Sequence, residues 1–535
     1  MVKSTEPFQR VAPDSLKAWL HDGREIALID VREAGEYGEN HLFYAINVPY
    51  SRLEKDIVRL VPNPAVRLVI VDEYGSELAD KAAQRLRVLG YKQIQILEGG
   101  NKAWRDSGKE LFAGVNVPSK AFGELAEHFF ETPRIEASEL RAKQIAGEDL
   151  VVFDGRPFNE YQKMNIPGAI CCPNGELALR VPEMVKSQST TIVINCAGRT
   201  RSIIGAQTLR NLGLANPIYA LENGTQGWFL ADFELEHGAQ RRHAIEGPLE
   251  TLEASRQRAQ KLAWSYKIKT IEAKTLLAWW HDEHRTTYLC DVRTPEEFAL
   301  NHLPGAVSTP GGQLVQATDQ YVAVRAARLV LWDGDGVRAP VIAHWLAQMG
   351  WDVSVLDYRT QPSEITTLPV TVRLSGSKAK LLDAKGMQAV YDQNVVIVDI
   401  RPSAAYRKTH LKKALWSSRR NLSRTLEGVD NSRPIVIVSD DEVEAQLAAN
   451  DLMESGRILT HYFPNFSSTA DFLGLECIGT PHLPPDSERI DYLFFVHDRH
   501  DGNKAAARQY LAWEINLLSQ LDDRESGAYR LCRPA

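Results

Sequence analysis

The sequence predicts an α/β protein built from four tandem domains, each a mainly parallel sheet with helices on both faces. Two observations lead to this fold class. A chain of 535 residues is longer than one hydrophobic core usually supports, so several cores are expected. Short runs of Val, Ile and Leu alternate with helical segments along the chain, and this alternation is typical of a parallel sheet covered on both faces.

An apolar run that ends in Asp-x-Arg opens each of four repeats. The repeats begin with IALIDVREAGEYGENHLFYAINVP (26–49), LVVFDGRPFNEYQKMNIPGAICCP (150–173), TYLCDVRTPEEFALNHLPGAVSTP (287–310) and, more faintly, VVIVDIRPSAAYRKTHLKKALWSS (395–418). They recur at intervals far longer than the roughly 20 to 50 residues of a solenoid repeat. Each repeat is therefore predicted to be a complete domain.

A second strand, a loop, a helix and a third strand follow in each repeat. We expect the second strands at 67–71, 191–195, 328–332 and 434–438. The helices are expected to end at Gly90, Gly213, Gly350 and Gly456, because glycine readily adopts the left-handed conformation that closes many helices.

Polar stretches predict the domain boundaries near residues 125, 255 and 375. The predicted domains are 1–125, 126–255, 256–375 and a degenerate fourth at 376–480, followed by a C-terminal extension at 481–535. Within the extension, residues 503–521 carry apolar side chains at helical spacing. This spacing predicts a helix that packs on the protein or forms an oligomer contact.

Composition narrows the classes of function. A hydrophobic fraction of 44% and a charged fraction of 24% are ordinary for a globular protein. No apolar run approaches the roughly 18 to 20 residues that cross a bilayer, and the polar N-terminus lacks the apolar segment of a secretory signal, so a cytoplasmic location is expected. A net charge of −7 gives no electrostatic reason to expect nucleic acid or a membrane as a partner.

Six cysteines are too few for a disulfide framework, and none has the spacing of metal ligands, so no metal is expected. Cys196 stands out because it follows the predicted strand at 191–195, and ligands of open α/β sheets gather at the carboxyl ends of strands. The segment from Cys196 reads Cys196-Ala197-Gly198-Arg199-Thr200-Arg201-Ser202 and leads into a predicted helix. We call residues 196–202 the Cys196 loop.

The Cys196 loop has the features of a nucleophile site for an anionic substrate. Its backbone N–H groups and the helix N-terminus favour negative charge, and therefore the thiolate form of Cys196. Arg199 and Arg201 add positive charge and paired donors for an oxyanion. A small, buried, inert cysteine is the alternative, but such a cysteine does not require flanking arginines.

Several motifs together resemble rhodanese domains. They are the Asp-x-Arg strand ends, the Glu-Tyr pairs at 36–37 and 160–161, the Pro-Gly-Ala runs at 167–169 and 304–306, the Cys196 loop, and Leu-Glu-x-Gly-x-x-x-Trp at 221–228, echoed at 97–104. The motifs recur in order over roughly residues 10 to 475. The layout is similar to that of bacterial sulfurtransferases with four rhodanese domains.

The resemblance implies a double-displacement reaction. The Cys196 thiolate would attack the outer sulfur of a small anionic donor such as thiosulfate, and would leave a covalent cysteine persulfide without any organic cofactor. Cyanide or a thiol would then accept the sulfur, and a protein sulfur acceptor is a further candidate. Loop amides at 197–201 would hold the persulfide charge.

The resemblance also suggests roles for the arginines. Arg199 and Arg201 are candidates to grip the sulfonate end of the donor, and Arg180 lies where some members of the family place a substrate arginine. Asp154 and Arg156 would brace the loop, or form an ion pair with a structural role alone.

Loop length distinguishes this reaction from phosphatase chemistry. Four residues separate Cys196 from Arg201, whereas the related cysteine-dependent phosphatases have five, so the shorter loop favours sulfur over phosphate. A persulfide carrier that serves a protein partner, a 3-mercaptopyruvate sulfurtransferase and a purely structural scaffold remain alternatives. The two loop arginines favour a sulfonate donor over a keto acid.

The other three domains lack the cysteine. Counting back from the helix-terminal glycines places Glu73, Asp333 and Ser439 at the position of Cys196, so these domains are expected to be inactive. They would serve as scaffolding, or dock a protein acceptor. The remaining cysteines, Cys171, Cys172, Cys290, Cys477 and Cys532, are interpreted as packing residues or as unactivated thiols.

Overall fold

The computed structural model describes residues 7–243, 249–369, 376, 379–457, 460–493 and 503–534. The chain divides into two compact units. One unit contains the sheets of the first and fourth repeats, and the other contains the sheets of the second and third repeats together with the C-terminal segment. Each unit is described by itself.

The first domain contains the strand path β1-β5-β4-β2, and β3 pairs with β2. Its strands are β1 (Gln9–Val11), β2 (Ile26–Asp30), β3 (Ile46–Asn47), β4 (Arg67–Val71) and β5 (Gln93–Leu97). Its helices are α1 (Pro13–Trp19), α2 (Ala34–Glu39), α3 (Leu53–Leu60), α4 (Glu77–Leu89) and α5 (Gly100–Asp106).

The second domain follows the same path, β6-β10-β9-β7-β8, with all neighbouring strands parallel. Its strands are β6 (Arg134–Ile135), β7 (Leu150–Asp154), β8 (Ile170–Cys171), β9 (Thr191–Asn195) and β10 (Ile218–Leu221). Its helices are α6 (Val117–Phe130), α7 (Ala137–Ala146), α8 (Phe158–Lys163), α9 (Leu177–Met184), α10 (Thr200–Asn211), α11 (Gly224–Leu230) and α12 (Leu249–Ser265). The predicted boundaries at 125 and 255 fall inside α6 and α12.

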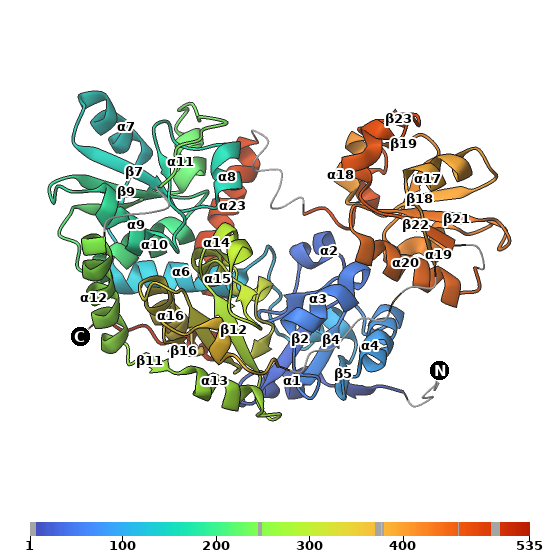
Figure 1. Cartoon of the computed structure of the whole chain (residues 1–535), viewed down its shortest axis with the longest axis horizontal. Coiled ribbons are helices and arrows are strands. Elements are labelled where there is room, and N and C mark those ends of the chain that lie inside the picture. The colour runs from blue at the N-terminus through green and yellow to red at the C-terminus, as the bar shows by residue number, and fades with distance from the viewer. Residues whose placement is uncertain are drawn as a thin grey trace. The chain divides into compact units, whose positions relative to one another are not determined.

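The third domain repeats the path as β11-β16-β15-β12-β13. Its strands are β11 (Lys269–Ile271), β12 (Thr287–Asp291), β13 (Val307–Ser308), β15 (Arg328–Trp332) and β16 (Asp352–Leu356), with a short β14 (Val324–Arg325) between them in sequence. Its helices are α13 (Ala273–Trp280), α14 (Pro295–Leu300), α15 (Gly311–Gln316) and α16 (Arg338–Gln348). Figure 1 shows α15 beside α16 in this domain.

The fourth domain has the path β17-β22-β21-β18-β20. Its strands are β17 (Lys380–Leu381), β18 (Val396–Asp399), β20 (Ala414–Trp416), β21 (Ile435–Val438) and β22 (Thr460–Phe463), and β19 (His410–Leu411) pairs separately with β23 (Cys477–Ile478). Its helices are α17 (Ala384–Tyr391), α18 (Ser403–Lys408), α19 (Leu422–Thr425), α20 (Glu442–Glu454) and α21 (Phe466–Thr469). The C-terminal segment adds α23 (Lys504–Asn516) and α24 (Asp523–Ser526).

The predicted fold class is confirmed by these sheets. The sheet of the second domain is buried on both faces, because alternate strand residues enter separate cores: Val152 and Val193 in one, Phe153 and Ile194 in the other. The glycines predicted to end the helices, Gly90, Gly213, Gly350 and Gly456, all have positive φ angles.

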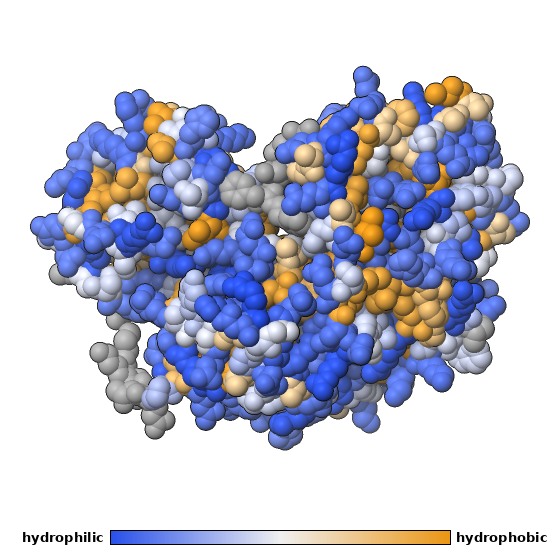
Figure 2. All heavy atoms as spheres, turned by 180° about the vertical axis from the view of Figure 1, so that it is seen from behind, coloured by the Kyte–Doolittle hydropathy of each residue, from blue (hydrophilic) through white to orange (hydrophobic). Residues whose placement is uncertain are grey.

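Polar and charged side chains cover most of the face drawn in Figure 2, with hydrophobic residues scattered among them. This pattern is ordinary for a folded protein surface. None of the helices in the described part of the chain combines the length and the apolar character that crossing a membrane requires.

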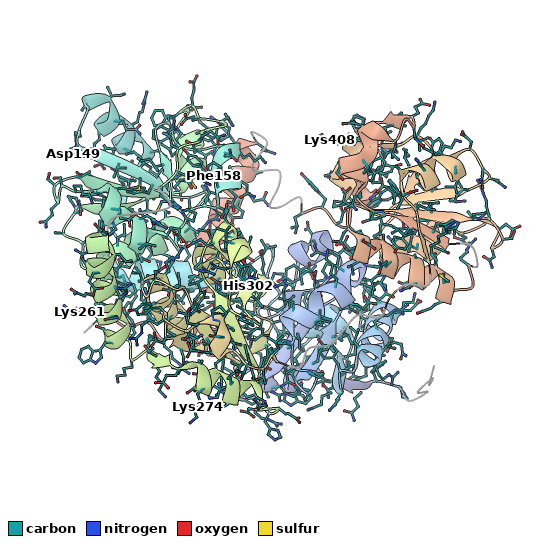
Figure 3. All side chains as sticks on the ribbon, viewed as in Figure 1. Asp149, Phe158, Lys261, Lys274, His302 and Lys408 are labelled. Carbon is teal, nitrogen blue, oxygen red and sulfur yellow. The ribbon has the colours of Figure 1, made fainter. Side chains whose placement is uncertain are left out.

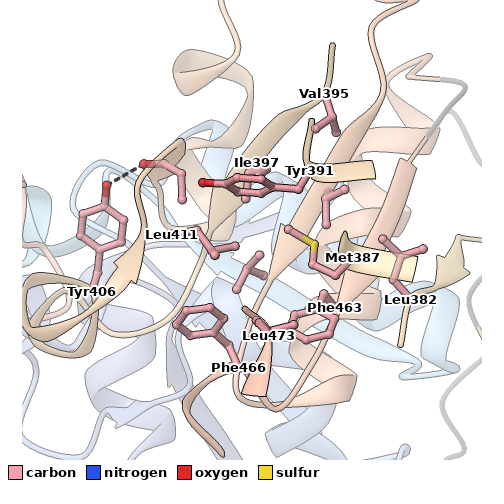
Figure 4. Close-up of a cluster of buried hydrophobic side chains, with 13 residues drawn as sticks. Leu382, Met387, Tyr391, Val395, Ile397, Tyr406, Leu411, Phe463, Phe466 and Leu473 are labelled. Carbon is pink, nitrogen blue, oxygen red and sulfur yellow. Dashed lines mark hydrogen bonds between the residues drawn. The ribbon is translucent and has the colours of Figure 1, made fainter. Parts of the chain in front are cut away.

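The fourth domain keeps a dense core although its sequence repeat is the faintest. Phe466, Met387 and Leu411 are buried in one cluster, and the Tyr406 hydroxyl donates to the Ala414 carbonyl at its edge (Figure 4). The Arg401 guanidinium lies 4.2 Å from the centre of the Phe466 ring. The degenerate repeat therefore retains a complete domain core.

Replacing Phe466 with alanine should destabilise the fourth domain by about 3 to 5 kcal/mol, because the change opens a cavity in this core. Hydrogen–deuterium exchange of the amides of β21 would measure the effect. Leu415→Ala serves as the control, since Leu415 is 45% exposed and its loss should cost less than about 0.5 kcal/mol. Equal protection in the two variants would contradict the prediction.

Candidate active site

Cys196 lies where the sequence places it, directly after β9 and just before α10. The residue is 2% exposed, and its Sγ lies 3.7 Å from the Ser202 hydroxyl. That hydroxyl donates to the Arg199 carbonyl at 2.7 Å, which holds the first turn of α10 against the loop. The thiol therefore sits at the N-terminus of a helix, where the helix dipole favours negative charge.

The N-terminus of α11 supports the Cys196 loop from a second side. The Thr225 amide donates to the Cys196 carbonyl at 2.8 Å, and the Gln226 side chain donates to the Ala197 carbonyl at 3.1 Å. Gly224 has a φ of +54°, and a Cβ atom there would lie 2.3 Å from the Cys196 carbonyl oxygen. The glycine of the Leu-Glu-x-Gly motif is therefore required by close packing against the loop.

Asp154 and Arg156 form a buried, bidentate ion pair. Arg156 Nε and Nη2 donate to the two Asp154 oxygens at 2.8 and 2.7 Å. The side-chain amide of Asn195 also donates to the Asp154 carboxylate at 2.7 Å, and the backbone amide of Gly155 donates to the backbone carbonyl of Asn195. Through Asn195 the pair is tied to the residue before Cys196, and α8 starts just beyond it at Phe158 (Figure 3).

Arg199 is directed toward α6. Its guanidinium donates to Glu124 at 2.7 and 2.9 Å and also to Glu127. Burial raises the pKa of Glu124 to about 7, although its bonds to Arg199 act in the opposite direction. The positive charge of Arg199 is thus already shared between two carboxylates.

Arg201 is directed toward α8 and the third domain. Its guanidinium donates to both oxygens of Glu160, at 3.0 and 2.8 Å, and to the Gln313 side-chain oxygen at 3.2 Å. Burial acts to lower the pKa of Arg201, but the charge and hydrogen bonds of Glu160 raise it, and the neighbouring Cys196 and Asp154 act in the same direction as Glu160. Glu160 is therefore the main partner of the Arg201 charge.

The second and third domains each contribute a side chain that contacts the loop arginine of the other. Gln313 and Glu176 occupy matching positions in the two repeats, and Arg338 matches Arg201. Arg338 donates to Glu176 at 2.9 Å and also pairs with Glu297 and Asp335. A Cβ on either Gly175 or Gly312 would lie 2.8 Å from the backbone nitrogen of the other, so only glycines allow this approach.

Among the ion pairs of the described residues, Arg180 meets these contacts only through Glu176. It is buried in α9 and pairs with Glu176 and Glu183 at 3.4 and 3.5 Å. Its charge is thus compensated by neighbours one helical turn away.

Two of the three loops without cysteine hold a carboxylate instead. In the third domain, the Asp333 carboxylate accepts from the amides of Asp335, Gly336 and Ala339 at 3.2, 2.9 and 2.8 Å. Burial and the nearby Asp335 raise the pKa of Asp333 to about 7, whereas the bonds from Gly336 and Ala339 lower it. The carboxylate of Asp333 therefore fills the loop at the position that the sequence assigns to this residue.

The first domain corrects one prediction. Counting from Gly90 placed Glu73 at the cysteine position, but β4 ends at Val71 and Asp72 follows it. The Asp72 carboxylate accepts from the loop amides of Tyr74, Gly75, Ser76 and Ala79, whereas Glu73 reaches out to Arg32 at 3.0 Å. The count failed because this loop is one residue longer before its helix. In the fourth domain Ser439 follows β21, and its hydroxyl accepts from the Asp441 amide.

The other buried cysteines are packing residues. Burial raises the pKa of Cys171 and of Cys290 to about 12, and it also raises the pKa of Cys172. These thiols stay protonated at neutral pH, which disfavours nucleophilic chemistry. Cys477 is partly buried and Cys532 is exposed.

Sequence reasoning missed several residues of the site. Glu124 and Glu127 of α6, Gln313 of α15 and Glu514 of α23 all contact the Cys196 loop from distant segments. None belongs to a repeated motif, so no local signal identifies them.

A pocket of about 500 Å³ adjoins the site. Thr225 and Gln226, which support the Cys196 loop, also line this pocket. Phe229, Phe233 and Met164 form its apolar wall, and Lys504 of α23 lines it together with Asp232, with which it forms an ion pair. A volume of this size suits a small organic molecule.

The rhodanese-like domain family matches this chain at residues 12–107, 136–231 and 272–358. A crystal structure named thiosulfate sulfurtransferase from Pseudomonas aeruginosa is 39% identical in sequence and superimposes with a TM-score of 0.90, covering 99% of this chain and 100% of that one. Two shorter relatives match single regions. The uncharacterized protein slr1261 of Synechocystis is 30% identical over 22% of this chain and 64% of its own length, and YrkF of Bacillus subtilis, named as a candidate sulfur carrier, is 27% identical over 24% and 71%.

Arg156→Met should destabilise the second domain by about 3 to 5 kcal/mol, because it leaves the buried Asp154 carboxylate without its partner. It should also change the rate at which iodoacetamide alkylates Cys196. The matched control is Arg293→Met, which breaks the equivalent pair with Asp291 in the third domain. Urea unfolding and alkylation kinetics would test both variants, and an unchanged alkylation rate in Arg156→Met would refute a bracing role for the pair.

Proposed function

This chain belongs to the rhodanese family, and on that premise we propose that it is a sulfurtransferase in which Cys196 carries sulfane sulfur as a persulfide. The donor proposed is thiosulfate or a similar small anion, and the acceptor is cyanide or a thiol. A Pseudomonas aeruginosa protein that matches along its whole length is named thiosulfate sulfurtransferase, which supports this donor.

The proposal rests on the side chains that occupy the matching loops of the first and third domains. At the position of Cys196, the carboxylates of Asp72 and Asp333 each accept several backbone N–H bonds from the loop. The same loop design thus directs several backbone donors at one side-chain acceptor in two domains of this chain. In the second domain the group at this position is a thiol, so the loop amides are suited to a thiolate and then to a persulfide anion.

The reaction proceeds in two displacements. The Cys196 thiolate attacks the outer sulfur of thiosulfate, the bond to the sulfonate sulfur breaks, and sulfite leaves with the electron pair. The acceptor then attacks the outer sulfur of the persulfide. The bond between the two sulfurs breaks, its electron pair returns to Cys196 as thiolate, and the acceptor carries the sulfur away.

We assign Arg201 to the binding of the anionic sulfur donor. Its neighbours are one carboxylate, Glu160, and the neutral Gln313, whereas Arg199 faces the two carboxylates Glu124 and Glu127. Arg201 therefore keeps more of its charge for an incoming anion.

A persulfide carrier that serves a protein partner is the second candidate. YrkF, which is named as a candidate sulfur carrier, aligns with part of this chain. The low exposure of Cys196, only 2%, favours small donors that fit into the site over a bulky protein surface. Turnover with small molecules separates the two functions.

Replacing Cys196 with serine should abolish the release of sulfite and thiocyanate from thiosulfate and cyanide, because serine cannot form a persulfide. The intact protein and the variant would be assayed side by side, and mass spectrometry after thiosulfate alone should find one added sulfur in the intact protein only. Cys290→Ser is the control, since that buried cysteine should not matter. If the intact protein turns over neither thiosulfate nor mercaptopyruvate, the carrier function is favoured.

Arg201→Met should raise the KM for thiosulfate by about tenfold, the effect of losing roughly 1.4 kcal/mol of charged hydrogen bonding. Glu160→Gln should lower this KM, because it releases Arg201 from its carboxylate. Glu297→Gln, the equivalent change beside Arg338, is the matched control and should leave the KM unchanged. Steady-state kinetics at a fixed cyanide concentration would measure the KM of all three variants. If Arg201→Met and the intact protein have equal KM values for thiosulfate, Arg201 does not contribute to binding of the sulfur donor.

A further inference from the structure

The C-terminal helix α23 packs on the domain that carries Cys196. Its buried residues are Ala507, Tyr510, Leu511 and Glu514, which recur at the spacing of one helical face. The helix lies against α6 and α11, as Figure 1 shows in red. It also supplies Lys504 to the pocket beside the loop. This segment lies outside the regions that the family matches.

Glu514 is the residue of this face that reaches the Cys196 loop. It is 2% exposed, and its Oε1 accepts from the Thr200 hydroxyl at 2.9 Å. The Lys120 Nζ lies 3.6 Å from the same oxygen. A charged group buried to this extent requires compensation, which Lys120 provides.

The second oxygen of Glu514 faces the loop backbone. Glu514 Oε2 has no hydrogen-bond partner within the described part of the chain. A Cβ atom on Gly198 would lie 3.1 Å from this oxygen and 3.6 Å from the Tyr510 ring. Glu514 and Tyr510 thus close over the loop at Gly198, where a larger residue would push the helix away.

We propose that Glu514 is a positioning residue of the Cys196 site, through which α23 holds the loop in shape and sets its charge balance. The proposal rests on the sulfurtransferase function proposed above. Glu514 fixes Thr200, the first residue of α10, and covers Gly198, so the amides between them keep the orientation that a persulfide needs. The carboxylate also places a negative charge beside a loop that must hold an anion.

The charges around Glu514 come from two other elements. Lys120 and Glu124 of α6 face it, and Arg199 of the loop interacts with it and with Glu124. Removing the negative charge of Glu514 would leave Lys120 in excess near the loop. The thiolate of Cys196 would then form at a lower pH, since a nearby positive charge favours an anion.

The experiment compares Glu514→Gln and Glu514→Ala with the intact protein. Glutamine keeps the size of the side chain and an acceptor for Thr200 but removes the charge, so the pH at half-maximal alkylation of Cys196 should fall by about 0.5 to 1 unit. Alanine also removes the contact with Thr200, and kcat should fall at least tenfold. Arg508→Gln, an exposed charge change on the same helix, is the control and should alter neither value.

Two further variants distinguish the proposed effects of Glu514 from a loss of the folded structure. Lys120→Met combined with Glu514→Gln removes both charges, so its alkylation profile should return toward that of the intact protein. Thr200→Val removes the hydrogen bond alone and should lower kcat without the pH shift. A pH profile that is the same in Glu514→Gln and in the intact protein would overturn the proposal.

Mass spectrometry of the intact protein after treatment with thiosulfate separates this proposal from the proposed function. If no persulfide forms on Cys196 in the intact protein, the sulfurtransferase function fails. If the persulfide forms equally in the intact protein and in Glu514→Ala, with equal kcat, only the role of Glu514 fails.

Discussion

The backbone N–H groups in the loops that follow β4, β9, β15 and β21 determine which side chain each loop can hold. These groups form a concave donor surface at a helix N-terminus, and a buried donor without an acceptor is costly. Asp72 and Asp333 satisfy them with a carboxylate from the chain itself. At Cys196 the side chain is a thiol, which accepts hydrogen bonds weakly until it is ionised. In the proposed reaction these donors would serve the ionised sulfur of the thiolate and of the persulfide.

Local signals were enough to predict the fold and the position of the cysteine. The strand at 191–195 matches β9, and the helix-ending glycines adopt positive φ, because both features depend on neighbouring residues. The identity of Asp72 was missed because the count assumed loops of equal length. Glu124 and Glu514 could not be predicted, since they approach Arg199 and Thr200 from segments 75 and 314 residues away and follow no repeat.

The structure also revises the picture of the loop arginines as free cations. Leaving a guanidinium buried without a partner costs several kcal/mol, so each one is paired before any donor arrives. Arg199 donates to Glu124 and Glu127, and Arg201 donates to Glu160. An incoming anion must therefore compete with these carboxylates, and its affinity depends on how completely each arginine is already compensated.

The third domain shows how this compensation is adjusted. Arg338 faces three carboxylates, Glu176, Glu297 and Asp335. At the equivalent place, Arg201 faces Glu160 and the neutral Gln313, so the Cys196 loop carries less negative charge around this arginine. Gln313 belongs to the third domain, which lacks a cysteine of its own in the loop. The third domain thus contributes a neutral side chain beside Arg201, and under the proposed function this leaves more of the arginine's charge for an anionic sulfur donor.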